Sequence, residues 1–460
     1  MKALAIAATV LFGTLSTAAA SPQAKSSLVV TGGLEQLVVP GDRSIVRYSV
    51  ESGSNAVRGT LYLRNDSRNT FAKVPLKRAG NFGARIPSRL IRGKRLSYYA
   101  VFTDPRTRKS LRLPARGTSR AWVLGHPVVI KLGTHQFGQT KSPEAVVARA
   151  RADQVGWDIN EELGFHLGPQ TLQVGSDASA WVEDSFNNRL LVWNPGKPDG
   201  FARAVPLPYG AGISDVAFGP GGSLYVTRKL IDPIRLVLDK IDATTGALLW
   251  ESRVGFEYAG GPNGNSYPLI GSDGSLRAGS DGSLYYLVGL PGGELGWMPV
   301  ATAAGKPLAP RAQVNGIRGA VPAAGGLTLL GPEFYTPRDD TAPHEARYAL
   351  VDRRGRLVRA WRIVSRTEFD FIHSMAPQLT GAEPLVVFDF VKSDGAQQTW
   401  EYEILRLGRN GASTQFSLAR SIWGDGVLDD LRLGPDGKLY QLATSPDLGV
   451  MISRYSLVTG

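Results

Sequence analysis

The chain has 460 residues, of which 43% are hydrophobic, and its 52 lysines and arginines against 40 aspartates and glutamates give a formal net charge of +12. It contains no cysteine, which excludes disulfides, thiolate zinc sites and cysteine nucleophiles. A chain of this length can bury a large core without such links, so the small disulfide-bonded scaffolds are excluded as well.

The first 20 residues have the pattern of a secretory signal peptide. Lys2 precedes a short apolar run, and the run ends in the small residues 18–21, which a signal peptidase can cut. We therefore predict a signal peptide over 1–20 and a secreted protein, extracellular or associated with the cell envelope. No later stretch is apolar for about 18 residues, so we expect no transmembrane segment.

Residues 26–120 show the short alternating segments of an antiparallel β-sandwich, separated by turns that contain glycine, proline and asparagine. Within them, residues 83–104 resemble a motif of bacterial extracellular immunoglobulin-like or fibronectin-like modules, which implies a spacer or adhesive role. This region also holds the densest cluster of lysines and arginines. The cluster is either a solvated basic face or a contact for an anionic envelope polymer.

Residues 121–165 form a linker between this module and the rest of the chain. They contain one apolar strand, at 126–132, and one predicted helix, at 142–152. Ser142 is a suitable helix cap, and Pro143 suits the first helical turn.

From residue 166 to 460 a repeat of about 40 to 50 residues appears. Its clearest copies are strand–turn–strand units at 172–184, 216–227, 276–286 and 431–441. A third and a fourth strand follow each unit, and four strands per repeat are typical of a propeller blade. We therefore predict six blades, of which the fourth and fifth are degenerate, at 166–209, 210–256, 266–314, 315–366, 369–420 and 424–460.

The last blade ends one strand short. A closed ring must borrow that strand, because an open sheet edge exposes unpaired backbone groups. We expect the segment before the ring to provide it, from residues 128–132 or 121–124. The fold class predicted from the sequence is thus all-β, with an N-terminal immunoglobulin-like sandwich and a six-bladed β-propeller.

The first blade, at 167–175 and 182–193, resembles an NHL repeat, and the second, third and last blades carry the same signature. NHL-like propellers include scaffolds and ligases that bind proteins or RNA, and the fold is shared by metal-dependent lyases and lactonases. The resemblance implies the fold and leaves the function open.

In NHL-like propellers the inner strand begins, and the second strand ends, at the same face of the ring. On this chain that rule brings carboxylates, arginines and one histidine to the central mouth. The predicted ligand-binding residues are Asp184, Asp215, Arg228, Arg318, His373 and Asp430.

This ring of side chains admits three interpretations. The three aspartates and His373 could hold a divalent cation such as calcium, magnesium or manganese. Arg228 and Arg318 could instead bind the carboxylate of a polar ligand such as a sugar acid. The polar residues could also only pair with one another and with water.

We predict a secreted, non-catalytic recognition protein that binds a polar ligand, peptide or glycan at the propeller mouth, with no cofactor other than a possible divalent cation. Its partner is an anionic envelope polymer, a glycan or a protein, and no specific nucleic acid is expected. One alternative is a metal-dependent lyase or lactonase, although His373 has no second channel histidine and Arg318 would repel a metal. The other is a structural extracellular module.

Overall fold

The computed structural model describes most of the chain after the first 27 residues. The predicted signal peptide lies outside the described residues, and no helix among the described residues is long and apolar enough to cross a membrane. The described ranges are 28–34, 36–41, 44–52, 55–160, 165–169, 171–207, 213–219, 222–231, 234–253, 257–258, 267–268, 276–289, 295–308, 321–332, 344–374, 383–395, 397–420 and 430–458.

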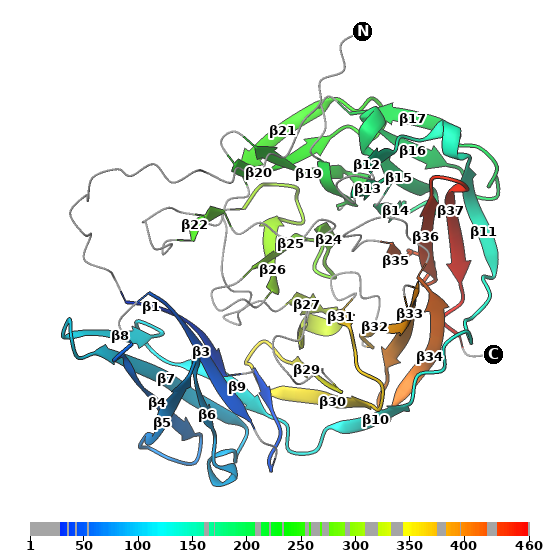
Figure 1. Ribbon diagram of the computed structural model, residues 1–460. Coiled ribbons are helices and arrows are strands. Elements are labelled where there is room, and N and C mark those ends of the chain that lie inside the picture. Colours follow the sequence, from blue (N-terminus) through cyan, green and yellow to red (C-terminus); the bar gives the residue numbers. More distant parts are fainter. Residues whose placement is uncertain are drawn as a thin grey trace, which may run out of the picture.

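Six sheets are arranged in a ring, which confirms the predicted six-bladed propeller (Figure 1). Within each blade, the strands that follow one another in sequence pair antiparallel. The blades consist of β14 (Leu172–Val174), β15 (Ala180–Asp184), β16 (Arg189–Trp193) and β17 (Arg203–Pro206); β18 (Ile213–Phe218), β19 (Leu224–Ile231), β20 (Ile234–Ile241) and β21 (Leu248–Arg253); β24 (Leu276–Ala278), β25 (Leu284–Gly289) and β26 (Leu295–Ala301); β27 (Val321–Ala323), β28 (Leu327–Leu330), β29 (Glu345–Val351) and β30 (Leu357–Ser365); β31 (Phe371–Ser374), β32 (Leu385–Asp394), β33 (Gln397–Leu407) and β34 (Ala412–Ala419); and β35 (Leu431–Leu433), β36 (Leu439–Ser445) and β37 (Gly449–Tyr455).

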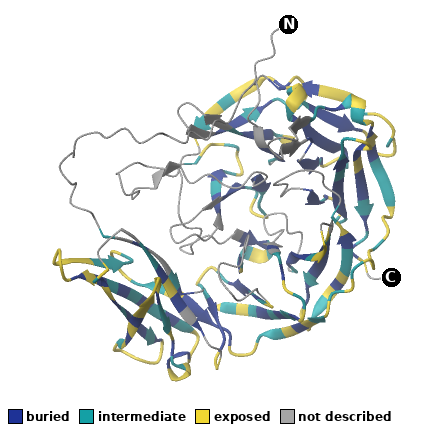
Figure 2. Ribbon diagram, viewed as in Figure 1, coloured by how far each residue is buried: buried dark blue, intermediate teal, exposed yellow. Residues whose placement is uncertain are grey.

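Two short pairs lie outside these blades: β12 (Asp158–Asn160) with β13 (Phe165–Leu167), and β22 (Glu257–Tyr258) with β23 (Tyr267–Pro268). In Figure 2 the buried residues follow the strands, and the exposed ones gather at the turns and on the outer strands.

The first hairpin of a blade repeats one local contact, which explains why the sequence repeat contains glycine. In blade 3 a Cβ atom at Gly279 would lie only 2.5 Å from Cε2 of Tyr285, so the tyrosine ring packs directly over the glycine. The same tyrosine donates its hydroxyl hydrogen to Asp281 in the turn, at 2.8 Å. Blade 6 repeats the contact with Gly434 and Tyr440. Glycine, turn aspartate and tyrosine therefore specify the hairpin together.

The predicted helix at 142–152 is wrong. Residues Ala145–Ala150 form strand β11, which pairs antiparallel with β37 and completes blade 6. Ala148 and Ala150 are buried on one side of the strand while Arg149 between them is exposed, an alternation of period two that a strand requires. The exposed edge of β37 overrides the local capping signal, because its unpaired backbone groups need a partner.

The expected closing segment, 128–132, has a different position. β10 (Val128–Gly133) pairs in parallel with β30 and so adds a fifth strand to blade 4. The chain before the ring therefore covers the outer edges of two blades, and the segment that completes the last blade is β11.

The N-terminal domain contains β1 to β9 and is all-β, as predicted. Its strands form one hydrogen-bonded path in the order β1-β3-β6-β5-β4-β7-β9-β2, with β8 on the edge of β7. β5 pairs with β4 through residues 72–76 and with β6 through residues 77–79, and the strands on both sides of it bury side chains in one core. The immunoglobulin-like class of this domain stays a prediction. The strands are β1 (Val29–Leu34), β2 (Leu37–Val38), β3 (Ile45–Ser52), β4 (Arg58–Asn65), β5 (Ala72–Ala79), β6 (Asn81–Arg85), β7 (Arg95–Asp104), β8 (Lys109–Leu113) and β9 (Ser119–Val123).

An apolar interface joins this domain to blade 4. Leu37 and Trp122 belong to one buried cluster with Leu330 and Val351 of the propeller. The indole N–H of Trp122 also donates to the carbonyl oxygen of Gly355, at 3.0 Å. Burial of apolar area together with a satisfied indole fixes the N-terminal domain against the side of the ring.

Candidate functional site

The inner strands of blades 1, 2, 3 and 6 lie next to one another around the centre of the ring. β14 contacts β18 and β35, and β18 contacts β24 (Figure 1). Side chains at the beginning of these strands come from positions far apart in sequence, and the ring makes them neighbours.

Asp215, on β18, is the centre of a buried ion cluster on this inner ring. Its carboxylate accepts hydrogen bonds from the backbone N–H groups of Val216, at 2.7 Å, and Leu276. Nη1 of Arg277 lies 3.5 Å from one carboxylate oxygen and Nη2 of Arg432 lies 3.5 Å from the other. One aspartate from blade 2 thus joins arginines from blades 3 and 6.

Both guanidinium groups lie beside the same carboxylate. Burial raises the pKa of Asp215, although the two arginines oppose this effect. Burial likewise lowers the pKa of Arg432, to about 10, with Asp215 opposing it. Arg432 is therefore a cation at neutral pH, which suits its place beside the Asp215 carboxylate. Nε of Arg432 also donates to the carbonyl oxygen of Leu172, at 2.6 Å, which adds blade 1 to the set.

Asp430 belongs to a second cluster, between blades 5 and 6. Burial raises the pKa of Tyr402 well above its ordinary value, and Asp430 raises it further. Nη1 of Arg420 lies 3.7 Å from a carboxylate oxygen of Asp389. Burial, and then the charge of Asp389, raises the pKa of Asp370. Burial opposes the charge of Arg420, but Tyr402, Asp389, Asp430 and Asp370 outweigh burial and raise its pKa, so this second cluster surrounds Arg420.

Asp184 and Arg228 are bound within or beside their own blades. Asp184 is fully buried and accepts hydrogen bonds from the backbone N–H of Gly156, at 2.8 Å, and from Nε of Arg189, at 2.8 Å. Arg228 extends outward along blade 2, where its guanidinium donates to Asp239 and, at 2.6 Å, to Glu251. Asp184 thus joins the linker to blade 1, and Arg228 joins strands of blade 2 to one another.

Of the remaining two predicted residues, the structure describes only the backbone of His373. Arg318 lies outside the described residues. The backbone of His373 is in β31 opposite Val387, and its side chain lies outside the description. Within the described ranges, no three histidine, aspartate or glutamate side chains are placed so that they could hold a metal ion.

The sequence prediction missed Arg277 and Arg432. Both occupy the middle of a three-residue inner strand between apolar neighbours, in Leu276–Ala278 and Leu431–Leu433. A cation in an otherwise apolar repeat position is the signal that could have found them, because a buried charge needs a partner.

Comparisons with known proteins leave the family open: no family model matches this chain, and no curated protein matches its sequence. The NHL-like class of the propeller therefore stays a prediction.

Proposed function

We propose that this is a secreted, non-catalytic recognition protein. Its N-terminal domain contacts an anionic envelope polymer, and its propeller mouth binds a polar ligand, either a peptide or a glycan. An NHL-like propeller with an immunoglobulin-like N-terminal module is part of this proposal, supported by the repeated hairpins and by the alternating strands of the N-terminal domain.

The observation that carries the proposal is the division of charge between the two domains. Residues 28–124 contain 19 lysines and arginines but only 5 aspartates and glutamates. Residues 125–460 contain 31 basic and 35 acidic residues. The N-terminal domain thus accounts for the positive charge of the whole protein, and the propeller carries a small negative charge.

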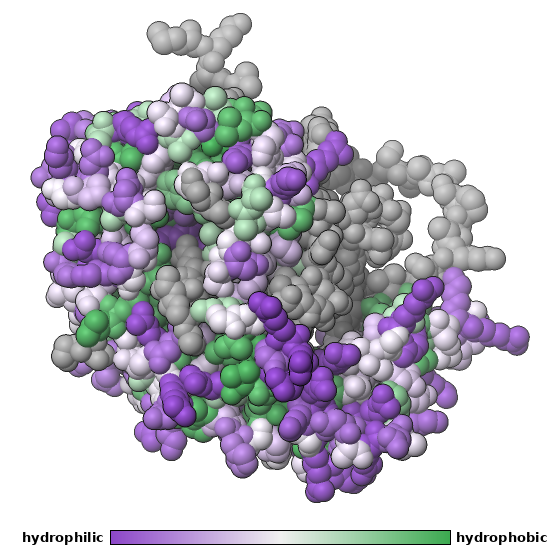
Figure 3. All heavy atoms as spheres, turned by 180° about the vertical axis from the view of Figure 1, so that it is seen from behind, coloured by the Kyte–Doolittle hydropathy of each residue, from purple (hydrophilic) through white to green (hydrophobic). Residues whose placement is uncertain are grey.

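The basic residues of the N-terminal domain are mostly on its surface. Exposed ones include Lys77, Arg89, Arg92, Lys94 and Arg108. Seen from behind, hydrophilic side chains cover this domain at the lower right of Figure 3. A polyanion that binds such a surface releases its condensed counterions, which favours association at low salt.

The mouth proposal comprises the same six residues, Asp184, Asp215, Arg228, Arg318, His373 and Asp430. Support comes from the buried guanidinium groups of Arg277 and Arg432, which lie beside Asp215 on the inner ring. A buried guanidinium pair favours a ligand with a carboxylate near the axis. His373→Ala is the variant that tests this part, since it should weaken binding of acidic peptides or glycans without changing adhesion to a polymer.

The experiment for the polymer contact compares immobilised polygalacturonate with neutral dextran at several salt concentrations. We expect the protein to bind only the polyanion, with an affinity that falls steeply as salt rises. Charge reversal at Arg92 and Lys94 should weaken the salt dependence. The slope of the logarithm of the binding constant against the logarithm of the salt concentration should become shallower by roughly one unit for each lost contact.

The matched control reverses two exposed lysines of the propeller, Lys197 and Lys306. If these reversals weaken binding as much as those in the N-terminal domain, attraction is a property of the whole surface and the proposed contact is refuted.

A further inference from the structure

The outer surface of β4, β5, β7 and β8, here called the basic face, is the side of the N-terminal domain that points away from its core. β4 lies between β5 and β7, and β8 pairs with the other edge of β7 (Figure 1). Residues alternate along β4: Leu61 and Leu63 are buried in the core, while Tyr62 and Arg64 point outward and are half-buried. Every second side chain of these strands therefore belongs to one surface.

One row of side chains crosses this face from β5 to β8. Tyr62 pairs directly with Lys73 on one side and with Tyr99 on the other, so the three share the face. Arg112 pairs with Val101, two positions after Tyr99, and joins them. The two tyrosine rings stack, with centroids 4.6 Å apart and an angle of 4° between their planes. Nζ of Lys73 lies 5.8 Å from the centre of the Tyr62 ring, and Cζ of Arg112 lies 4.1 Å from that of Tyr99.

A third cation of the face is also held against a ring. Cζ of Arg64 lies 4.7 Å from the centre of the Phe71 ring, which meets the row edge-on. Arg112 is fixed further, because its guanidinium donates to the carbonyl oxygens of Pro114 and Gly117. A guanidinium has five N–H donors, so others can still bind a ligand. Cations held in this way lose less conformational entropy when an anion binds them.

The rest of the basic face adds cations and hydroxyl groups. In β4, β5, β7, β8 and β9, which all lie within the described range 55–160, the positions that point away from the core hold no aspartate or glutamate. Asp104 of β7 is buried on the other side of the sheet. The further basic and hydroxyl side chains at the outward positions are Arg58, Arg95, Arg120, Thr60, Ser97, Thr103 and Ser110.

This arrangement suits an acidic polysaccharide better than a nucleic acid. Single-stranded nucleic acids stack their bases on open aromatic faces. Here Tyr62 is covered by Lys73 and Tyr99, and Tyr99 is covered by Tyr62 and Arg112, so neither tyrosine offers a ring face to a base. Arginine forks match carboxylates, and the hydroxyl groups of the face can exchange hydrogen bonds with those of a sugar.

We propose that the basic face binds a linear acidic polysaccharide, with Arg64, Lys73 and Arg112 as the cations that contact its carboxylates. The proposal rests on the polymer contact of the proposed function and gives that contact a place and a ligand class. Lys94, in the turn before β7, lies at the end of the same face, since its backbone N–H bonds to the carboxylate of Asp66 directly after β4.

The test measures binding of the full-length mature protein to immobilised polygalacturonate at several salt concentrations. The double variant Arg64→Gln, Lys73→Gln removes two cations of the basic face. We expect its affinity at low salt to fall about tenfold, and the slope of the logarithm of the binding constant against the logarithm of the salt concentration to become shallower by roughly two units.

The matched control is Arg47→Gln, Arg85→Gln, which lowers the net charge equally. Both arginines are exposed, on β3 and β6. Arg47 points away from the core, because the next residue, Tyr48, is buried against Phe102 of β7, with ring centroids 5.0 Å apart. We expect the control to keep the slope and the affinity of the parent nearly unchanged.

Tyr99→Thr keeps every charge but removes the ring that holds Arg112. We expect a roughly two- to fivefold loss of affinity, the effect of one exposed cation–π contact, with an unchanged salt slope. An affinity equal to that of the parent would refute the role of the row in holding the cations.

Equal loss of affinity in the two double variants, with polygalacturonate bound by the parent, would overturn the basic face as the site and leave the polymer contact standing. No binding of polygalacturonate by the parent at low salt would instead refute the proposed contact itself, and the basic face with it. Tighter binding of oligothymidylate than of polygalacturonate would show that bases do stack on the domain, and would refute an acidic polysaccharide as the ligand.

Discussion

Arg432 of blade 6 and Asp215 of blade 2 meet across the inner ring, with Nη2 of the arginine 3.5 Å from Oδ1 of the aspartate. Blade 1 lies between these blades in the order of the ring, and Arg432 also binds the carbonyl oxygen of its Leu172. While β11 closes the ring at the outside, the bond from Arg432 to Leu172 joins the first and last blades at the inside, and the ion pair extends this link to blade 2.

Replacement of Arg432 by methionine should destabilise the protein by about 3–5 kcal/mol, because it leaves the carboxylate of Asp215 with one cation fewer in a buried site. Urea denaturation of the purified protein measures this change. Arg409→Met, at an exposed arginine, is the control and should stay within about 0.5 kcal/mol. A cost for Arg432→Met no larger than that of the control would show that the pair does not hold the ring together.

Gly279→Ala should destabilise blade 3 by about 1–3 kcal/mol, since the added methyl group would lie 2.5 Å from the Tyr285 ring and force it to move. The control is Gly125→Ala, where an added Cβ meets no atom within 4 Å. Thermal unfolding of the two variants side by side gives the comparison. Equal melting temperatures would mean that the glycine of the repeat is not required by packing.

Ala148→Glu tests the closing strand β11. Ala148 is fully buried between β37 and blade 1, so a carboxylate there would be desolvated without a partner, at a cost of several kcal/mol. We expect a lower denaturation midpoint and self-association on size-exclusion chromatography, because a displaced β11 exposes the edge of β37. Arg149→Glu, on the exposed side of the same strand, should keep the parent behaviour. Matching behaviour of the two variants would contradict the register of β11.

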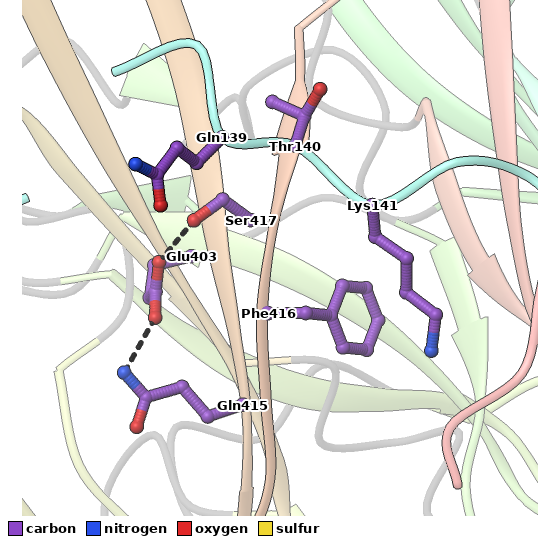
Figure 4. Close-up of a pocket in the computed structure, with 7 residues that line it drawn as sticks. All are labelled: Gln139, Thr140, Lys141, Glu403, Gln415, Phe416 and Ser417. Atoms are coloured by element: carbon purple, nitrogen blue, oxygen red, sulfur yellow. Dashed lines mark hydrogen bonds between the residues drawn. The ribbon is translucent and has the colours of Figure 1, made fainter. Parts of the chain in front are cut away.

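Residues 134–144, which connect β10 to β11, cross the outer strand of blade 5 (Figure 4), and this contact should depend on pH through His135 and Glu403. The pKa of His135 is raised in the folded protein, so its contribution is fully present below its ordinary value of about 6.5 and is lost as pH rises through the folded value. The pKa of Glu403 is lowered, so its contribution is present above its ordinary value of about 4.3 and is lost as pH falls. The contact is therefore strongest between these two limits.

The free energy of unfolding of the parent and of His135→Gln, followed from pH 5 to pH 9, measures this dependence. We expect the difference between the two proteins to shrink as pH rises above about 6.5. A difference that stays constant over this range would show that His135 is not held as a cation by the two glutamates.

Local patterns in the sequence were enough to predict the ring. The clearest repeats, at 172–184, 216–227, 276–286 and 431–441, correspond to the first hairpins of blades 1, 2, 3 and 6. A hairpin of two strands with alternating apolar residues and a glycine turn forms from residues adjacent in sequence. About a dozen residues are therefore enough to predict it. The same holds for blade 4, where a degenerate repeat still forms β27 and β28.

The site could be predicted less well than the fold. Asp215 was found as an acidic residue at the beginning of an inner strand, but its partners Arg277 and Arg432 are 62 and 217 positions further along the chain. Asp184 accepts a hydrogen bond from Gly156 of the linker and Arg228 donates to Asp239, and neither partner could be read from the repeat pattern.

The sequence by itself determined the all-β class, the number of blades and the concentration of positive charge in residues 28–124, because each of these depends on short-range pattern or on composition. Only the tertiary structure decided that residues 145–150 form a strand, that β10 joins blade 4, and that three distant charged residues meet on the inner ring. These depend on which sheet edge or buried charge lies nearest in space. That proximity arises from closure of the ring, since edges and charges find partners only when blades remote in sequence become neighbours.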